Sequence, residues 1–399
     1  MMPGLRSAYN KNFTESKYAA FLADLDGLYN HKITFRVAET PVFVGREFRD
    51  KLIKASAEII DFLVSDEVKK LTESAIPSRL KVPHETRHTL FLALDFAVVD
   101  EEGELEPRLI EMQGFPSLFG WQDVLSQKYR QHFDIPDKWQ SHFGLSSEAY
   151  RKKLRMILLN GHDPENVILL EIDPIKQNTA IDFFVTKEMA GIEPVHIGDV
   201  EREGRTLFYH KEGRRIAVKR IYNRVIFDEL EKRKDLQLSF NLTEDVDVEW
   251  AGHPNWFYRI SKYTMPLIKS KYIPECKYLS EYKKFPTDLE NYVLKPLFSF
   301  SGSGVVFHVS ANDLNSIPED HRHEFMLQRK VQYQPVVKAP DGLVKVEIRL
   351  LFLWEDGQLR PQLVTNPRLV FVIFYTNHFS PAEPCQVGNQ LGPQLTIFP

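Results

Sequence analysis

Apolar residues recur at helical spacing in two stretches near the start of the chain, residues 16–29 and 46–63, with charged residues between them. In the second stretch the apolar positions form one inward face: Phe48, Leu52, Ile53, Ile59, Ile60 and Leu63. Residues three and four apart share one side of a helix, so both stretches are predicted to be amphipathic helices that cover a core.

From residue 90 the pattern becomes that of strands. Residues 90–99 are apolar except for Asp95, residues 100–103 read as a turn, and residues 108–113 form a second apolar run. Two apolar runs joined by a short turn that contains glycine predict a β-hairpin.

The hairpin carries polar side chains inside its apolar runs. Glu111 and Gln113 are two apart and share a face, and pairing of the strands could bring Asp95 alongside them. A buried carboxylate is costly unless it is paired or binds a cation, and three oxygen-bearing side chains suit a hard cation such as Mg²⁺. The alternative is that Asp95 and Glu111 pair with arginine or lysine elsewhere in the core, and the hairpin alone leaves both interpretations open.

The middle of the chain alternates between strand and helix patterns. Residues 167–170, 193–197 and 215–219 read as strands, and residues 178–190 read as a helix that ends at Gly191. This order predicts a small parallel sheet with covering helices. The segment lacks the GxGxxG pattern, so a dinucleotide site is unsupported.

From about His253 the chain is rich in strands, at residues 292–296, 304–309, 325–328, 344–353 and 362–374. Lys295 stands at the end of the first of these strands, before a loop of alternating serine and glycine that contains Ser299, Ser301, Gly302, Ser303 and Gly304. Such a loop offers backbone N–H and hydroxyl donors to phosphate oxygens, although it is not a Walker loop. An ordinary Gly/Ser hairpin turn is the alternative.

Three later segments carry further polar candidates. The strand at 325–331 ends in polar residues and could present its backbone to an adenine edge, or simply leave the core. Glu347 and Arg349 are two apart in a strand, so they could hold metal and phosphate together or pair with neighbours. Arg368 and Asn377 are polar points in the last apolar run.

A zinc-protease motif must also be weighed. Residues 84–88 read His-Glu-Thr-Arg-His, which on a helix would place His84 and His88 on zinc with Glu85 as the base. Arg87 puts a cation between the two ligands, and no third histidine follows at metzincin spacing. We interpret the segment as a polar turn before the buried strand.

Composition narrows the function classes. The 399 residues are 43% hydrophobic and 27% charged, with a net charge of −4, which indicates a folded protein and gives no support for binding nucleic acid or an anionic membrane. Two cysteines, Cys276 and Cys385, exclude a disulfide framework. The start of the chain has no apolar signal core and no stretch approaches the roughly 20 residues of a membrane helix, so we expect a cytoplasmic protein.

Together these segments resemble the ATP-grasp superfamily in a circularly permuted order, similar to the glutathionylspermidine-synthase-like ligases. The resemblance rests on the hairpin at 95–116, on residues 218–224, on the segment 255–268, on the lysine and Ser/Gly loop from 295, and on Glu347-Ile-Arg349. It implies an α/β and α+β fold in which two α+β lobes form the ATP-grasp core beside a small parallel-sheet pre-ATP-grasp domain. The expected division is 1–150 for the helices and metal hairpin, 155–255 for the pre-ATP-grasp domain and 256–399 for the nucleotide-binding lobes.

The resemblance also implies roles for individual residues. The expected nucleotide-binding residues are Lys262, Lys295, Ser301, Gly302, Ser303, Gly304, Gln328, Lys330 and Val331. The expected metal ligands are Asp95, Glu111, Gln113, Glu347 and Asn377, and the expected catalytic residues are Arg349 and Arg368. Gln113 replaces the family's usual asparagine, and Glu347 replaces its usual aspartate.

The activity implied by the resemblance is an ATP- and Mg²⁺-dependent carboxylate–amine ligase that acts through an acyl phosphate on small-molecule or peptide substrates. The alternatives are a kinase or a non-catalytic nucleotide-binding protein of the same fold, and the HExxH zinc protease. The sequence names neither the acid nor the amine, and it gives no oligomeric state.

Overall fold

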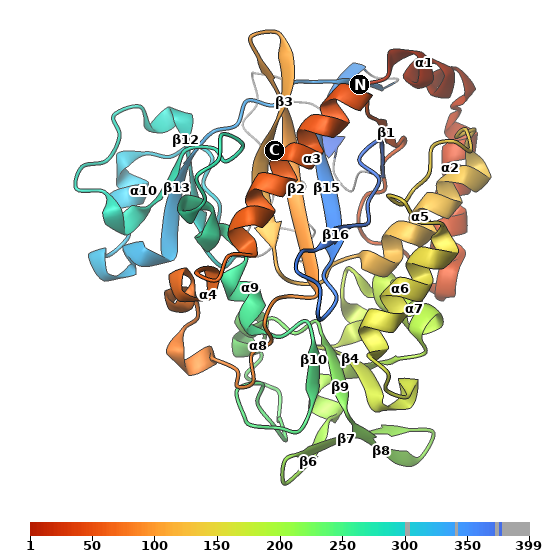
Figure 1. Ribbon diagram of the computed structural model, residues 1–399, viewed down its shortest axis with the longest axis vertical. Helices are drawn as coiled ribbons and strands as arrows, with labels where there is room; N and C mark the ends of the chain where they lie inside the picture. Colours follow the sequence, from red (N-terminus) through yellow and green to blue (C-terminus); the bar gives the residue numbers. More distant parts are fainter. Residues whose placement is uncertain (300–303, 340–341, 372–374, 377–399) are drawn as a thin grey trace.

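The structure is a computed structural model that describes residues 1–299, 304–339, 342–371 and 375–376 (Figure 1). It has a mixed α/β architecture with several sheets. Within the described residues, no helix combines the length and apolar character needed to cross a membrane.

A long antiparallel sheet joins the front of the chain to its back, as the adjacent orange and blue strands of Figure 1 show. The strand order is β14-β15-β2-β3, and β16 and β18 also pair with β15. The strands are β2 (Phe91–Glu101), β3 (Glu104–Gln113), β14 (Val337–Ala339), β15 (Gly342–Leu353), β16 (Gln362–Leu363) and β18 (Tyr375–Thr376). The predicted hairpin is therefore β2–β3, and the strand predicted at 344–353 pairs directly with it.

One face of this sheet is covered by α3 (Arg46–Leu63), which lies across it in Figure 1. The helix has the bounds that its apolar spacing predicts. Phe48, Leu52 and Ile59 are buried in one cluster with Leu94 and Phe96 of β2, while Ile53 is only partly buried. The apolar stripe of the helix thus buries the even-numbered side chains of the strand.

The opposite face changes character along the strands. At one end, Phe91, Ala93 and Leu351 belong to an apolar cluster shared with α6 (Ser147–Leu159) and α7 (Ala180–Ala190). Further along the same face, Arg349 stands opposite Asp95, which in turn stands opposite Glu111. Residues directly opposite each other in a sheet point to the same side, so the charged side chains are gathered at the polar end of this face.

The middle of the chain forms a parallel sheet in the order β10-β9-β4-β5. Its strands are β4 (Val167–Glu171), β5 (Glu193–His196), β9 (Arg220–Asn223) and β10 (Glu249–Ala251). The small parallel sheet and the helix that ends at Gly191, where φ is +76°, follow the prediction. The predicted strand at 215–219 is β8, and it belongs instead to an antiparallel ribbon that projects at the bottom of Figure 1, made of β6 (Glu201–Glu203), β7 (Thr206–Lys211) and β8 (Arg214–Val218).

A third sheet, with the order β11-β13-β12, lies at the left of Figure 1. Its strands are β11 (Cys276–Tyr278), β12 (Tyr292–Pro296) and β13 (Phe325–Arg329), and α10 (Ala311–Asn315) lies beside them. The predicted strand at 304–309 does not form: only Val306 makes an isolated bridge, to Leu294. The other edge of β12 pairs with β13 along its whole length, whereas the segment after the Ser/Gly loop adds only this bridge to the sheet.

The remaining helices gather mainly at the right of Figure 1 around an aromatic core that includes Phe21, Trp121 and Tyr129. They are α1 (Pro3–Asn12), α2 (Glu15–Gly27) and α5 (Phe119–His132), with the short α4 (Val68–Leu71), α8 (Phe227–Lys232) and α9 (Asn255–Arg259) elsewhere. The single strand predicted at 362–374 is interrupted, because Asn366-Pro367 turns the chain and β17 (Leu369–Val370) pairs with β1 (Val42–Phe43) instead of continuing β16.

Candidate functional site

The centre of the polar sheet face is a buried ion pair between Asp95 of β2 and Arg349 of β15. Arg349 donates from Nε to Oδ1 at 2.7 Å and from Nη2 to Oδ2 at 2.6 Å. Although burial opposes the charge of the guanidinium, Asp95 raises the pKa of Arg349 above its usual range. Both oxygens of Asp95 thus accept hydrogen bonds from Arg349. This is the pairing with arginine that the sequence left open as the alternative to a metal ion.

Glu111 of β3 has a different cation. Lys262 Nζ lies 3.1 Å from Glu111 Oε1 and donates to the carbonyl of Ser299 at 2.8 Å. Burial opposes ionisation of Glu111, but Lys262 and Arg349 outweigh it and lower the pKa of the carboxyl. Lys262 begins a short 3₁₀ helix, Lys262–Leu267, whose start is fixed by a capping box between Ser261 and Thr264.

Lys295 reaches the same region from β12. Its side chain is buried, and Nζ lies 3.4 Å from the carbonyl oxygen of Ile110, next to Glu111. Burial and the neighbouring charge of Lys262 lower the pKa of Lys295 to about 8. Two lysines held this close would be stabilised by a polyanion between them.

Glu347 stands at the other side of the group. It accepts a hydrogen bond from the Tyr333 hydroxyl. Burial, together with the negative charges of Asp95 and Glu111, raises the pKa of Glu347 to about 7 despite that hydrogen bond. Burial thus opposes the charged form of Glu347, and a cation beside it would favour that form.

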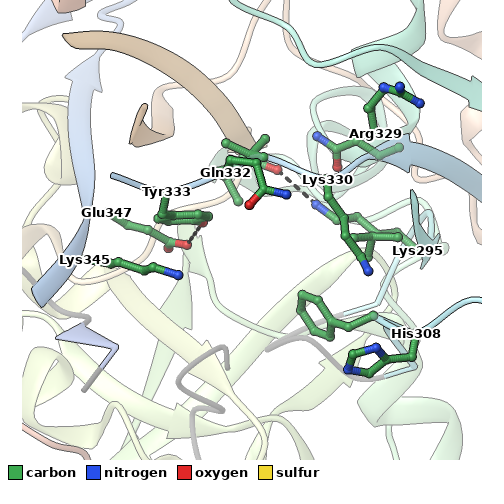
Figure 2. Close-up of a pocket in the computed structure, with 13 residues that line it drawn as sticks. Lys295, His308, Arg329, Lys330, Gln332, Tyr333, Lys345 and Glu347 are labelled. Atoms are coloured by element: carbon green, nitrogen blue, oxygen red, sulfur yellow. Dashed lines mark hydrogen bonds between the residues drawn. The ribbon is translucent and has the colours of Figure 1, made fainter. Parts of the chain in front are cut away.

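Lys295, Glu347 and Tyr333 line a cavity of about 360 Å³. Figure 2 shows Glu347, Tyr333 and Lys345 on one side of it and Lys295 and His308 on the other. The end of β13 and the segment after it supply the wall between them, including Gln328, Lys330 and Val331. The side chain of Gln328 is buried, and neither its Oε1 nor its Nε2 has a hydrogen-bond partner among the described residues.

Several of the candidates named from the sequence are thus brought together by the structure: Asp95, Glu111, Lys262, Lys295, Gln328, Lys330, Val331, Glu347 and Arg349. Gln113 stands two residues beyond Glu111 on β3, with a buried Oε1 that has no partner in the described part of the chain. Gly304, with φ of +73°, lies against Pro296 just after β12. Ser301, Gly302, Ser303 and Asn377 lie outside the described residues.

Arg368 is not brought to this cavity. It lies between β16 and β17, where its guanidinium is 4.4 Å from the ring centre of Trp139. The sequence analysis placed it near the phosphates on resemblance alone, and the turn at Asn366-Pro367 leads the chain to β1 instead.

Sequence reasoning missed several residues of the cavity wall: Ile110, Val293, Phe307, His308, Arg329, Gln332, Tyr333 and Lys345. Tyr333 is the most informative, because it alone donates to Glu347 in the hydrogen bonds described. Its only sequence signal is its position five residues after Gln328, in a polar stretch between two strands.

A further buried arginine lies at the carboxyl edge of the parallel sheet. Arg224 follows β9, packs 4.8 Å from the ring centre of Phe115, and has Nε and Nη1 without a hydrogen-bond partner among the described residues. Glu171 ends the adjacent strand β4, and burial raises its pKa to about 8 against the pull of Arg224. Because β5 and β9 flank β4 on opposite sides, this edge is a topological switch point, where ligands commonly bind.

No group of three or more His, Cys, Asp or Glu in the described part of the chain is arranged to hold a metal ion. Mg²⁺ needs fewer protein ligands than such a group provides, since it is usually bound by one or two carboxylates together with water and phosphate oxygens. Glu111, Glu347 and the unpaired oxygen of Gln113 fit that donor set, whereas Asp95 is held by Arg349.

The HExxH segment has no zinc-protease geometry. Residues 84–88 are not helical, and His84 has a left-handed φ of +58°. His84 pairs with Asp245, His88 stacks on Trp354, and Glu85 binds Arg259. The two histidines therefore lack the helical spacing that would direct both to one metal ion.

Comparisons with known proteins bear on the fold. No model of a known protein family matches the chain, and no curated protein matches it in sequence. Among solved structures, the chain is similar to a glutathione synthetase-like effector (GSS30) from Globodera pallida in its apo form, with a TM-score of 0.56 and 12% identity over 90% of this chain and 94% of the other. The two chains share a fold at low sequence identity, and the mixed α/β architecture is compatible with an ATP-grasp-like fold.

Proposed function

We propose that this chain is an ATP-dependent ligase that joins a carboxylate to an amine and binds its nucleotide in the cavity beside Lys295. One observation carries the proposal: two buried lysines, Lys262 and Lys295, and two partly buried glutamates form one charged group beside a cavity. Lys295 and Glu347 line that cavity, and Lys262 pairs with Glu111 next to it. Burying charged side chains of either sign costs free energy. A magnesium-bound triphosphate would offset that cost, because its phosphates would pair with the lysines and its metal ion with the glutamates.

The two ends of the cavity suit different parts of the nucleotide. The Gln328–Val331 wall offers a strand end and an amide side chain with unsatisfied donor and acceptor atoms, which suit the edge of an adenine. Lys262 and Lys295 would hold the phosphates at the other end.

The metal expected with the nucleotide is Mg²⁺, and the donors proposed for it are Glu111, Glu347 and Gln113. When bound, Mg²⁺ would neutralise charge on the phosphates during transfer of the terminal phosphoryl group. Asp95 is proposed instead to position Arg349, whose charge stabilises the negative oxygens of the reacting groups.

Arg224 is proposed to bind the carboxylate-bearing substrate. Arg224 packs against Phe115, and Phe115 closely follows β3, the strand that carries Glu111 and Gln113. We therefore propose that a substrate held by Arg224 would reach the phosphates. The substrate carboxylate attacks the terminal phosphorus, the bridging P–O bond breaks, and ADP leaves. The amine then attacks the acyl carbon, phosphate departs, and the amine loses a proton to give the amide.

The chain order of the site supports a circularly permuted ATP-grasp arrangement. The hairpin proposed to bind the metal, β2–β3, precedes the lysine strand β12 in sequence, yet β15 from the back of the chain pairs with it. We propose that the third sheet and this long sheet are the two lobes that enclose the nucleotide.

A non-catalytic nucleotide-binding protein is the second candidate. The Asp95–Arg349 pair favours it, because both oxygens of the Asp95 carboxylate are bonded without a ligand. Such a site could bind Mg-ATP without turnover.

Two measurements test these candidates. Isothermal titration with ATP in the presence and absence of Mg²⁺ should show magnesium-dependent binding. ADP release should then rise when pooled amino acids, short peptides or polyamines are added. Binding without ADP release with any acceptor pool would favour the binding protein, and failure to bind any nucleotide would refute both.

A further inference from the structure

A second cavity, of about 400 Å³, lies between the first turn of α3, the loop at 138–146 and the turn at 366–368. It shares no lining residue with the cavity beside Lys295. Arg49, Lys138 and Arg368 line it, and its described lining contains no aspartate or glutamate. The chain as a whole has a net charge of −4, so this concentration of positive charge is a local feature.

Arg368 is the most constrained of these cations. Its guanidinium lies over Trp139, and its buried Nε has no hydrogen-bond partner among the described residues. Burial and the nearby charges of Arg46 and Arg49 lower its pKa. Both of those arginines belong to the first turn of α3, where the helix dipole adds further positive potential.

The walls of the cavity are fixed by hydrogen bonds. Asn366 Nδ2 donates to the carbonyl of Gln140 at 2.7 Å, and the Phe143 amide donates to the carbonyl of Val364 at 2.9 Å. The amide of Arg368 donates to Asn366 Oδ1 at 3.0 Å. The backbone on either side of Arg368 is therefore held in place before any ligand arrives, which lowers the entropic cost of binding.

His142 adds a buried polar group to the lining. Its side chain is 5% exposed, it stacks on Tyr150, and its Nε2 lies 2.7 Å from Asp123 Oδ1. Asp123 is held in turn by Arg151 and Ser147. Because Nε2 is bonded to this carboxylate, His142 forms a fixed part of the cavity wall.

We propose that this cavity binds the phosphate monoester of a small organic molecule, at a site separate from the one proposed for ATP. Arg368 and Lys138 provide the charge for the phosphate group, and Arg49, which also pairs with Asp50, adds a third cation. Phe143, 39% exposed, and Leu145 provide apolar surface for the organic part. Inorganic phosphate alone would leave most of a cavity of this volume unfilled.

The test uses phenyl phosphate, inorganic phosphate and phenol as probes in isothermal titration with the full chain. Phenyl phosphate should bind more tightly than inorganic phosphate, and phenol should not bind measurably. Arg368→Gln should weaken phenyl phosphate binding about tenfold or more, because a charge-assisted hydrogen bond is lost, and Arg368→Lys should retain part of the affinity.

Lys295→Met is the matched control, since it removes a cation from the other cavity and should leave phenyl phosphate affinity unchanged. The thermal melting temperature of each variant shows whether it is folded. Absence of phenyl phosphate binding to the folded wild-type chain would overturn the proposal. So would binding that Lys295→Met abolishes and Arg368→Gln leaves intact.

Discussion

The two cavities handle buried charge in opposite ways. On the polar sheet face, cations and carboxylates from β2, β3, β15 and the Lys262 segment are interleaved, so that Asp95 meets Arg349 and Glu111 meets Lys262. The described lining of the cavity at Arg368 has three cations and no carboxylate, although Arg49 also pairs with Asp50 outside it. Interleaved charges can be stable without a ligand, whereas a set of one sign calls for a counter-ion.

The largest expected effect comes from breaking the central ion pair of the sheet. Arg349→Met should lower the free energy of unfolding by about 3–5 kcal/mol, because it leaves the Asp95 carboxylate buried and unpaired. The double variant Asp95→Asn/Arg349→Met should recover much of that loss. Urea denaturation of the single and double variants measures the difference. Equal stability of wild type and Arg349→Met would show that the pair is not as buried as described.

The next effect concerns nucleotide binding. Lys295→Met should weaken ATP binding at least about 30-fold, because a buried cation aimed at the phosphates is lost. Lys284→Met, at an exposed position of the same region, is the matched control and should leave the affinity unchanged. Titration of both variants with Mg-ATP measures the two affinities. Equal affinities would show that Lys295 does not contribute to nucleotide binding.

The affinity for ATP should decrease on both sides of a narrow pH range. Phosphate favours protonated Lys295, so affinity should decrease as the pH rises above about 8. Mg²⁺ favours ionised Glu347, so affinity should also decrease as the pH falls below about 7. Glu347→Gln should flatten the acid side while leaving the alkaline side in place. An unchanged acid side in that variant would assign it to another group.

The smallest effect tests the repulsion around Arg368 by the sign of a change in stability. Arg46→Gln should stabilise the protein by about 0.2–0.5 kcal/mol at low salt, because it removes repulsion with Arg368. Arg360→Gln, which removes an exposed ion pair with Asp61, should destabilise it by a similar amount. Thermal melts at low and high salt would show both differences shrinking as salt rises. Destabilisation by Arg46→Gln would mean that the arginine cluster is already neutralised.

The sequence was sufficient to predict those elements whose pattern lies within one short stretch of the chain. The apolar spacing of α3 and the acid-bearing hairpin were predicted correctly, since both depend on residues close together in the chain. It was also sufficient to select Lys262, Lys295 and Glu347, which do converge.

The rest depended on partners that no local pattern specifies. Nothing near Asp95 shows that Arg349, 254 residues away, will take both of its oxygens. The strand predicted after the Ser/Gly loop does not form, and only Val306 bridges Leu294 of β12. Arg368 was assigned to the phosphates by its place in the sequence, but the proline turn before it determines where it lies.

The pairing of β2 with β15 has a consequence for synthesis of the chain on the ribosome. β2 has nine consecutive buried residues, and the strand that covers one of its edges is made about 250 residues later. At 5–20 residues per second that gap lasts roughly 10–50 s. During that time the apolar hairpin has one open edge, so translation speed and chaperones should govern how much of the protein reaches its native state.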